Sequence, residues 1–154
     1  MDLQKAEILA IDLLKKHNLK NWNFYFDKAK KRFGCCNYTD KKISLSRFLV
    51  ELNTEEQVKD VILHEIAHAL VGPKNNHNHL WKKKVKEIGG SPSVKFCNNE
   101  VKLPKMKYTA KCKNCNLTFQ AAKINPQVAC RHCCKKFNNG KYSKKFTFVF
   151  FQND

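Results

Sequence analysis

The chain has 154 residues, of which 30 are Lys or Arg and 13 are Asp or Glu, and its formal net charge is +17. This length allows one ordinary domain, alone or with a small appendage, and excludes a large multidomain protein. No apolar run approaches the ~20 residues of a membrane-crossing helix, so we expect no membrane span.

The positive charge is concentrated toward the C-terminus. Residues 1–90 hold 17 Lys and Arg against 11 acidic residues, a net of +6, whereas residues 91–154 hold 13 against 2, a net of +11. Such a basic segment favours a polyanionic partner, with nucleic acid first and an acidic membrane surface second. A lysine-rich solvated surface is the alternative explanation.

Eight cysteines are many for this length. Four of them form two C-x-x-C pairs, which is typical of a zinc site and not of a disulfide framework. The N-terminus lacks the uninterrupted apolar run and small residues of a secretory signal. We therefore expect an intracellular, reducing compartment, either nucleus or cytoplasm, in which thiolates remain available for metal.

The first predicted element is an amphipathic helix over residues 3–17, with apolar side chains at helical spacing. The next three elements are short segments that alternate as strands do, at residues 22–26, 34–38 and 43–46. Together they predict a small, largely antiparallel sheet. None of these segments carries an evident chemical motif.

The central predicted helix begins at Thr54, which forms a capping box with Gln57 three residues later. It ends at Gly72-Pro73, a combination that stops helices. Inside it lies His64-Glu65-Ile66-Ala67-His68, an H-E-x-x-H motif. On a helix, residues four apart project from one face about one turn from each other.

Two imidazoles so placed can hold one Zn²⁺, with Glu65 beside the metal to take a proton from its bound water. A catalytic zinc site needs a third protein ligand and one open position. The polar loop after the helix offers His77 and His79, and spacing alone does not choose between them. For the oxyanion of the reaction, Tyr38, Lys74 and His79 are candidates without a spacing argument.

A short helix with the apolar stripe Trp81, Val85 and Ile88 follows and ends at Gly89-Gly90. Residues 91–105 lack a clear period and predict a connector. Cys97 within it is most simply a packed or free thiol.

The last fifty residues change character. A strand at residues 107–111 leads into Cys112-Lys-Asn-Cys115, and fourteen residues separate this pair from Cys130-Arg-His-Cys133. Each pair offers two thiolates to one tetrahedral Zn²⁺, so all four positions are filled and the site is structural. His132 and Cys134 are spare candidates, and the choice between Cys133 and Cys134 stays open.

A strand at residues 146–151 closes this zinc ribbon. Its aromatic side chains could stack on nucleic-acid bases. Because a ribbon this small needs apolar packing, a place in the core is the favoured interpretation.

Together these features resemble the SprT-like zinc metallopeptidases, a family that includes Spartan-related proteases of DNA–protein crosslinks. The segments that carry the resemblance are Trp22 to Asp27, Arg32-Phe33-Gly34, Ile43-Ser-Leu-Ser46, Leu63-His-Glu-Ile-Ala-His-Ala69 and the four-cysteine ribbon.

The family has a third histidine four residues before an aromatic residue, and here that register falls on His77 and Trp81. The resemblance thus implies zinc on His64, His68 and His77, with Glu65 as general base. The Gly-Pro that usually follows this histidine is absent here.

We therefore expect an α+β fold. Its zincin-like metallopeptidase core, residues 1–95, would have a small, mainly antiparallel sheet and the H-E-x-x-H helix. Residues 96–104 would form a connector, and residues 105–154 a β zinc ribbon with zinc on Cys112, Cys115, Cys130 and Cys133.

The expected function is that of a zinc metalloendopeptidase, which the resemblance associates with proteins bound or crosslinked to DNA, as in DNA repair. It would be a monomer with one catalytic and one structural zinc ion, contacting DNA through its basic C-terminal part and having no membrane partner. Two other hypotheses remain: a non-catalytic, zinc-dependent nucleic-acid-binding protein, and a peptidase with no DNA role.

Overall fold

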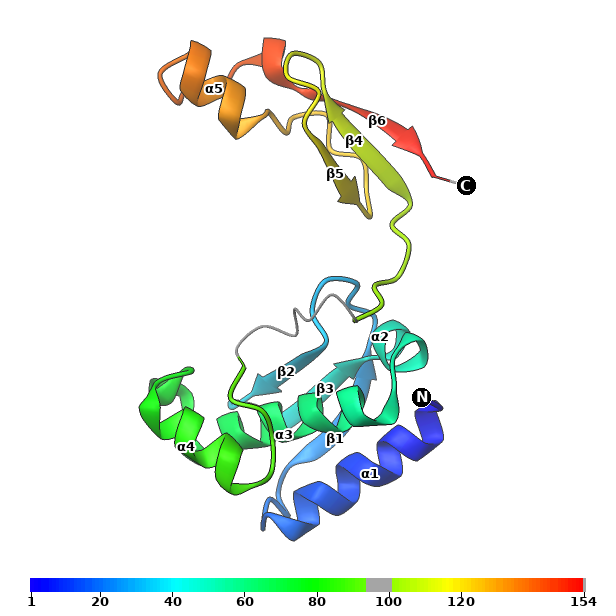
Figure 1. Cartoon of the computed structure of the whole chain (residues 1–154), viewed down its shortest axis with the longest axis vertical. Helices are drawn as coiled ribbons and strands as arrows, with labels where there is room; N and C mark the ends of the chain where they lie inside the picture. Colours follow the sequence, from blue (N-terminus) through cyan, green and yellow to red (C-terminus); the bar gives the residue numbers. More distant parts are fainter. Residues whose placement is uncertain (94–100, 154) are drawn as a thin grey trace. The chain divides into compact units, whose positions relative to one another are not determined.

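The computed structural model describes residues 1–93 and 101–153 and divides the chain into two compact units, Met1–Pro104 and Lys105–Asp154 (Figure 1). Cys97 and most of the expected connector lie outside the described residues.

The first unit is built from helices and one small sheet. In chain order its elements are α1 (Leu3–Lys16), β1 (Asn23–Asp27), β2 (Gly34–Asn37), β3 (Lys42–Ser46), α2 (Arg47–Leu52), α3 (Glu55–Val71), the 3-10 turn η1 (Pro73–Asn75) and α4 (His79–Glu87). Periodicity did not predict α2, a six-residue helix that starts directly after β3. It is capped by Ser46, whose hydroxyl oxygen accepts a hydrogen bond from the Leu49 N–H at 3.3 Å.

The sheet of this unit has the strand order β1-β3-β2. β2 and β3 form the expected antiparallel hairpin, whereas β1 pairs with the other edge of β3 in parallel. The sheet is therefore mixed. Because β2 occupies one edge of β3, β1 can join only at the opposite edge, and the β1–β2 connection must pass around the end of β3.

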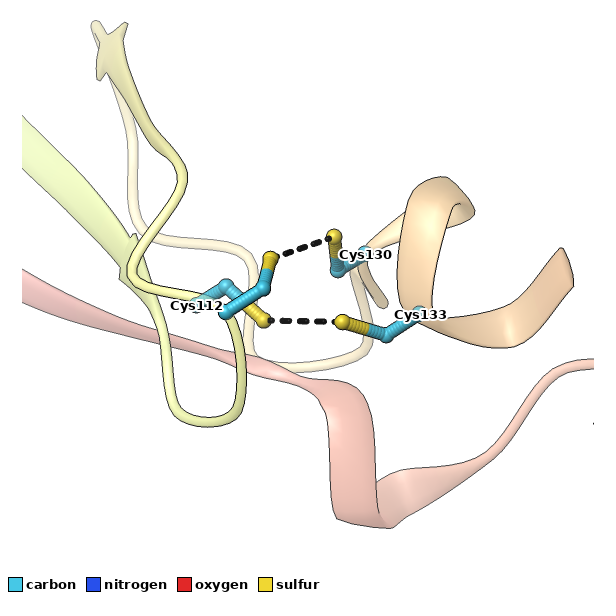
Figure 2. A group of neighbouring side chains, drawn as sticks. Cys112, Cys130 and Cys133 are labelled. Atoms are coloured by element: carbon cyan, nitrogen blue, oxygen red, sulfur yellow. Dashed lines mark hydrogen bonds between the residues drawn. The ribbon is translucent and has the colours of Figure 1, made fainter. Parts of the chain in front are cut away.

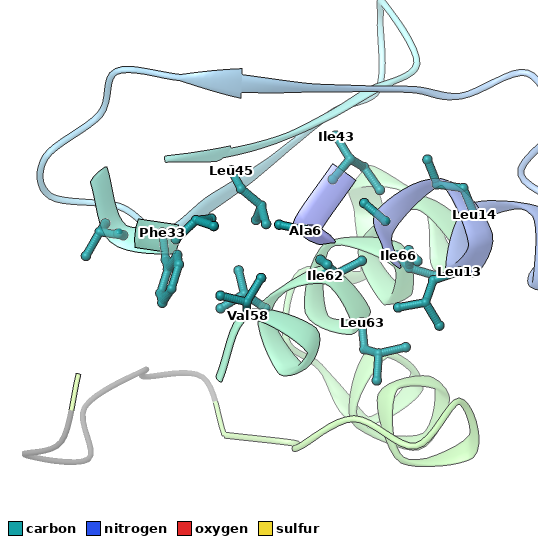
Figure 3. Packing of buried hydrophobic residues seen from close by; sticks show 14 of the residues in the cluster. Ala6, Leu13, Leu14, Phe33, Ile43, Leu45, Val58, Ile62, Leu63 and Ile66 are labelled. Atoms are coloured by element: carbon teal, nitrogen blue, oxygen red, sulfur yellow. The ribbon is translucent and has the colours of Figure 1, made fainter. Parts of the chain in front are cut away.

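Helices α1 and α3 pack on this sheet and enclose the main hydrophobic core (Figures 1 and 3). From β3, Ile43 and Leu45 point toward the helices and are at most 1% exposed. From α3, Val58, Ile62 and Ile66 are fully buried. The buried face of α3 therefore fixes this helix against the sheet, and with it the H-E-x-x-H motif.

The predicted ends of α3 are confirmed. Thr54 and Gln57 form both hydrogen bonds of the capping box. At the other end Gly72 has a φ of 79°, a left-handed conformation that favours glycine, and its N–H donates to the His68 carbonyl at 3.0 Å. The helix thus ends three residues after its last histidine, and the chain turns back toward the same helix face.

The second unit contains β4 (Tyr108–Cys112), β5 (Thr118–Ala121), α5 (Arg131–Phe137), the 3-10 turn η2 (Lys144–Phe146) and β6 (Phe148–Gln152). Its sheet has the order β5-β4-β6 and is antiparallel throughout. Sequence patterning did not predict α5, and it placed the start of the last strand two residues early because η2 takes up Lys144–Phe146. The small core consists of Ala110, Phe148 and cysteine side chains.

The α+β fold class is confirmed, with an H-E-x-x-H helix packed on a small sheet and a separate β unit that carries four clustered cysteines. In the part of the chain that the structure describes, no helix is both long and apolar enough to cross a membrane.

Candidate active site and metal centres

Three histidine side chains converge at the C-terminal half of α3. His64 and His68 project from the helix one turn apart, and His77 reaches them from the loop between η1 and α4. The Nε2 atoms of His64 and His68 are 3.2 Å apart, and that of His77 lies 3.0 Å from each of them. The structure thus brings together the three histidines expected at a catalytic zinc.

This arrangement fits a metal ion. Four ligands at the usual Zn–N distance of about 2.0–2.1 Å would lie about 3.3 Å from one another in a tetrahedron. Three histidines supply three of those positions and leave the fourth open, which is the pattern of a catalytic site. Among the residues that the structure describes, no aspartate or glutamate belongs to this ligand group.

His77 depends on an unusual backbone conformation. Its φ is 52°, in the left-handed region that few non-glycine residues adopt, although histidine is one of the more tolerant. By contrast, His79 begins α4 and is exposed, and it does not belong to the histidine group.

The indole of Trp81 packs against all three imidazoles. Its ring centroid lies 4.6 Å from that of His64, 5.2 Å from His68 and 4.6 Å from His77. Trp81 is fully buried. It therefore restricts the rotamers of the three rings. The apolar stripe in the sequence predicted only that Trp81 is buried, and not this role.

Burial keeps these histidines neutral. It lowers the pKa of His64 to about 3, with the neighbouring His68 and His77 adding to the effect, and it lowers the pKa of His68 to about 4. The pKa of His77 is also lowered, first by burial and then by Lys82. Neutral imidazoles offer the nitrogen lone pairs that a metal needs, and those of His64 and His68 stay neutral well below pH 7.

Glu65 is buried beside the histidines, with 6% of its surface exposed. Burial raises the pKa of its carboxyl group to about 8, although the positive charge of Arg32 opposes this shift. Arg32 itself donates a hydrogen bond to Asp27 at 2.7 Å. A carboxyl group with this pKa can both accept and return a proton near neutral pH.

A cavity of about 770 Å³ opens onto this group. Glu65 and the three histidines form part of its lining, and Tyr38 lies in its wall. Burial raises the pKa of Tyr38 to about 12, so its hydroxyl keeps its proton. The other oxyanion candidates, Lys74 and His79, are exposed and do not line the cavity. A larger cavity of about 960 Å³ at the start of α3 contains none of the predicted site residues.

In the second unit four cysteine sulfurs form the other cluster (Figure 2). The Sγ atoms of Cys112 and Cys133 are 3.8 Å apart, and those of Cys115 and Cys130 are 3.7 Å apart. Thiolates bound tetrahedrally to zinc at about 2.3 Å lie about 3.8 Å from one another, so the spacing fits. Cys134 is buried on α5 but does not belong to the group.

The thiols of this cluster need a cation to ionise together. Burial raises the pKa of Cys133 to about 12, and it also raises that of Cys130. At Cys112 burial is outweighed by hydrogen bonds from the backbone of Cys115 and Asn114, which lower the pKa to about 7. Among the described residues no two cysteines form a disulfide.

The sequence model of the SprT-like family matches residues 7–121, which include the whole histidine site and the first cysteine pair. The chain belongs to the SprT-like family. Membership together with the histidine group supports a metallopeptidase, and it confirms the resemblance seen in the sequence.

Other comparisons add little to the SprT-like assignment. No curated protein matches the chain. A solved structure described as the metallopeptidase zymogen of Methanocaldococcus jannaschii jannalysin is 21% identical, with a TM-score of 0.48, over 62% of this chain and 85% of that chain.

Zinc binding to the metal-free SprT-like unit is expected to release about one proton from Glu65 at pH 7. A carboxyl group with a pKa of about 8 carries its proton at this pH, and a neighbouring dication favours the ionised form. The histidines are already neutral and release none. Calorimetry in two buffers of different ionisation enthalpy measures this number. It should fall to near zero for Glu65→Gln, and an unchanged release would contradict the assignment.

Replacement of His77 by Ala is expected to weaken zinc binding at the histidine site by at least about 100-fold, because only two protein ligands would remain. His79→Ala is the matched control. It lies two residues away, is exposed, and should leave the affinity within about threefold of wild type. Competition with a chromophoric chelator gives both constants. Equal losses in the two variants would show that the loop, and not the His77 ligand, is responsible.

Proposed function

We propose that this SprT-like chain is a zinc metalloendopeptidase that cleaves proteins bound or crosslinked to DNA. The observation that carries the peptidase part is the convergence of three histidine nitrogens, 3.0–3.2 Å apart, beside a buried carboxyl group in one cavity. A structural site would fill all four positions with protein ligands, whereas three histidines that line a cavity would leave one position for reactants.

In the proposed reaction each group of the chain has a distinct task. A zinc ion held by His64, His68 and His77 would supply a Lewis acid that makes water acidic at neutral pH and polarises the scissile carbonyl. Glu65 accepts a proton from the attacking water and then delivers it to the leaving amine nitrogen. Tyr38 keeps its proton and is placed in the cavity wall, where it can donate a hydrogen bond to the developing oxyanion.

The DNA part of the proposal is supported by the charge and surface of the second unit. Residues 105–154 contain 11 Lys and Arg and a single acidic residue. Large side chains also remain exposed on this unit: Phe137, Tyr142 and Phe151 are 53–56% exposed. Cationic side chains neutralise phosphates, and exposed aromatic rings can stack on unpaired bases. We propose that the unit holds the substrate's DNA and thereby concentrates attached protein near the peptidase site.

The cysteine cluster also bears on the setting of this activity. Four thiols that must remain reduced to bind zinc favour a reducing, intracellular compartment. We therefore propose that the enzyme acts inside the cell, with one zinc ion in each cluster.

The experiment compares two substrates, a protein covalently attached to an oligonucleotide and the same protein alone. The zinc-loaded full chain should cleave the conjugate faster, lose activity with a chelator, and lose the advantage of the conjugate as salt rises. Equal cleavage of both substrates at every salt concentration would retain the peptidase and reject the DNA role. Absence of cleavage in every arm, at full zinc occupancy, would reject the peptidase.

A further inference from the structure

Gly34, the first residue of β2, lies directly against the side chain of Glu65. A Cβ atom placed on Gly34 would be 2.6 Å from Glu65 Oε1, 2.8 Å from its Cγ and 3.0 Å from its Cδ. These distances are well below the ~3.5 Å of ordinary atomic contact. Any side chain at this position would therefore collide with Glu65 as it now lies.

The backbone itself does not require glycine at this position. The glycines with a positive φ are Gly72, Gly89 and Gly140, whereas Gly34 is a regular strand residue paired with Leu45 on β3. A glycine inside a strand costs stability, because it loses more conformational entropy on folding than alanine does. Close approach of the Glu65 side chain is the physical reason for glycine here.

This contact matters because little else in the described structure fixes the Glu65 carboxyl group. No hydrogen bond or ion pair to it is found among the described residues; Arg32 acts on it only through its charge. A glutamate side chain has several rotatable bonds, and a misplacement of about 1 Å in a reacting group can cost about 100-fold in rate. Packing must therefore supply the orientation.

We propose that Gly34 is a positioning residue: the side-chain-free backbone of β2 forms the wall that holds Glu65 toward the cavity. Strand pairing makes this wall rigid, because Gly34 to Asn37 are all paired with β3. The catalytic consequence rests on the proposed function, in which Glu65 is the general base. The contact itself does not, and it can be tested without any activity.

The first test is a double-mutant cycle for stability on the full chain. Gly34→Ala is expected to lower the melting temperature by about 5–10 °C, as overpacking does. In a Glu65→Ala background, where the colliding side chain is gone, the same substitution should leave the melting temperature unchanged or raise it slightly. Equal losses in the two backgrounds would overturn the proposal.

Gly90→Ala is the matched control. Its Cβ would meet Val85 Cγ2 at 2.9 Å and Leu63 Cβ at 3.0 Å, a comparable collision that does not involve Glu65. Its cost in melting temperature should be the same in the wild-type and Glu65→Ala backgrounds. If the cost of Gly90→Ala depended on Glu65 as strongly as that of Gly34→Ala, overpacking in general would explain the effect. That result would count against the proposal.

The second test is kinetic and uses zinc-loaded protein of measured metal content. Gly34→Ala should lower kcat about 100-fold with little change in KM or bound zinc, because it displaces the base and not the substrate. Gly90→Ala, whose added methyl group collides with Val85 and Leu63 and not with Glu65, should lower kcat by less than about tenfold. An equal loss in the two variants would refute positioning. If the wild type cleaves nothing, the proposed function fails while the stability cycle still decides the contact.

Discussion

Glu65→Gln is expected to lower the rate of peptide hydrolysis by about 10²–10⁴-fold while zinc remains bound. Glutamine has nearly the same shape as glutamate, so the packing against Gly34 and the buried environment are retained. It cannot accept a proton, and no other carboxyl group lines the cavity of about 770 Å³ in the described structure. The reaction would therefore lose its base and its proton donor together.

Single-turnover cleavage of the protein–oligonucleotide conjugate measures this effect, with zinc content determined on the same samples. Glu56→Gln is the matched control, because Glu56 is an exposed carboxylate on the same helix and its loss should leave the rate unchanged. A Glu65→Gln variant that cleaves at the wild-type rate would falsify the assigned mechanism.

Cys112→Ser is expected to release the zinc of the second unit and to unfold residues 105–154, while the first unit stays folded. The cluster Ala110, Phe148 and the cysteine side chains is too small a core to offset the chain entropy of fifty residues. Structural zinc contributes about 10–16 kcal/mol at neutral pH to such units. The first unit has its own core between α1, α3 and the sheet, and does not depend on this metal.

Zinc stoichiometry and amide chemical-shift dispersion report this outcome, since only the resonances of the second unit should collapse. DNA binding should be lost in parallel if this unit supplies it. Cys134→Ser is the control, because Cys134 is also buried yet lies outside the sulfur group. Zinc loss from this control as well as from Cys112→Ser would show that Cys134 supplies a ligand.

Local sequence signals predicted the long elements well. All three long helices occur in the structure, and each was predicted from a signal that spans only a few residues. These signals were the apolar period of α1, the capping box and Gly-Pro stop of α3, and the apolar stripe of α4. The elements that were missed, α2 and α5, have six and seven residues, too few for a period to emerge. The parallel pairing of β1 with β3 was missed because strand order depends on which edge is free.

The sequence by itself determined the kind of chemistry. Residue type sets which atoms can bind zinc, and a spacing of four residues on a capped helix, or two in a C-x-x-C pair, places two ligands together through local backbone geometry alone. For that reason the pairs His64 with His68, and Cys112 with Cys115, could be named as candidate ligands before any fold was known.

Tertiary structure alone decided how distant segments meet. Spacing in the sequence left His77 and His79 as alternative third ligands, and only the family resemblance favoured His77. In the structure, a left-handed backbone conformation at His77 brings its ring to the other two histidines. Likewise Cys133, and not Cys134, faces Cys112 because of the direction in which α5 presents them. The contact between Gly34 and Glu65 joins residues 31 positions apart, and no local signal encodes it. Such contacts depend on the path of the whole chain, which local spacing does not specify.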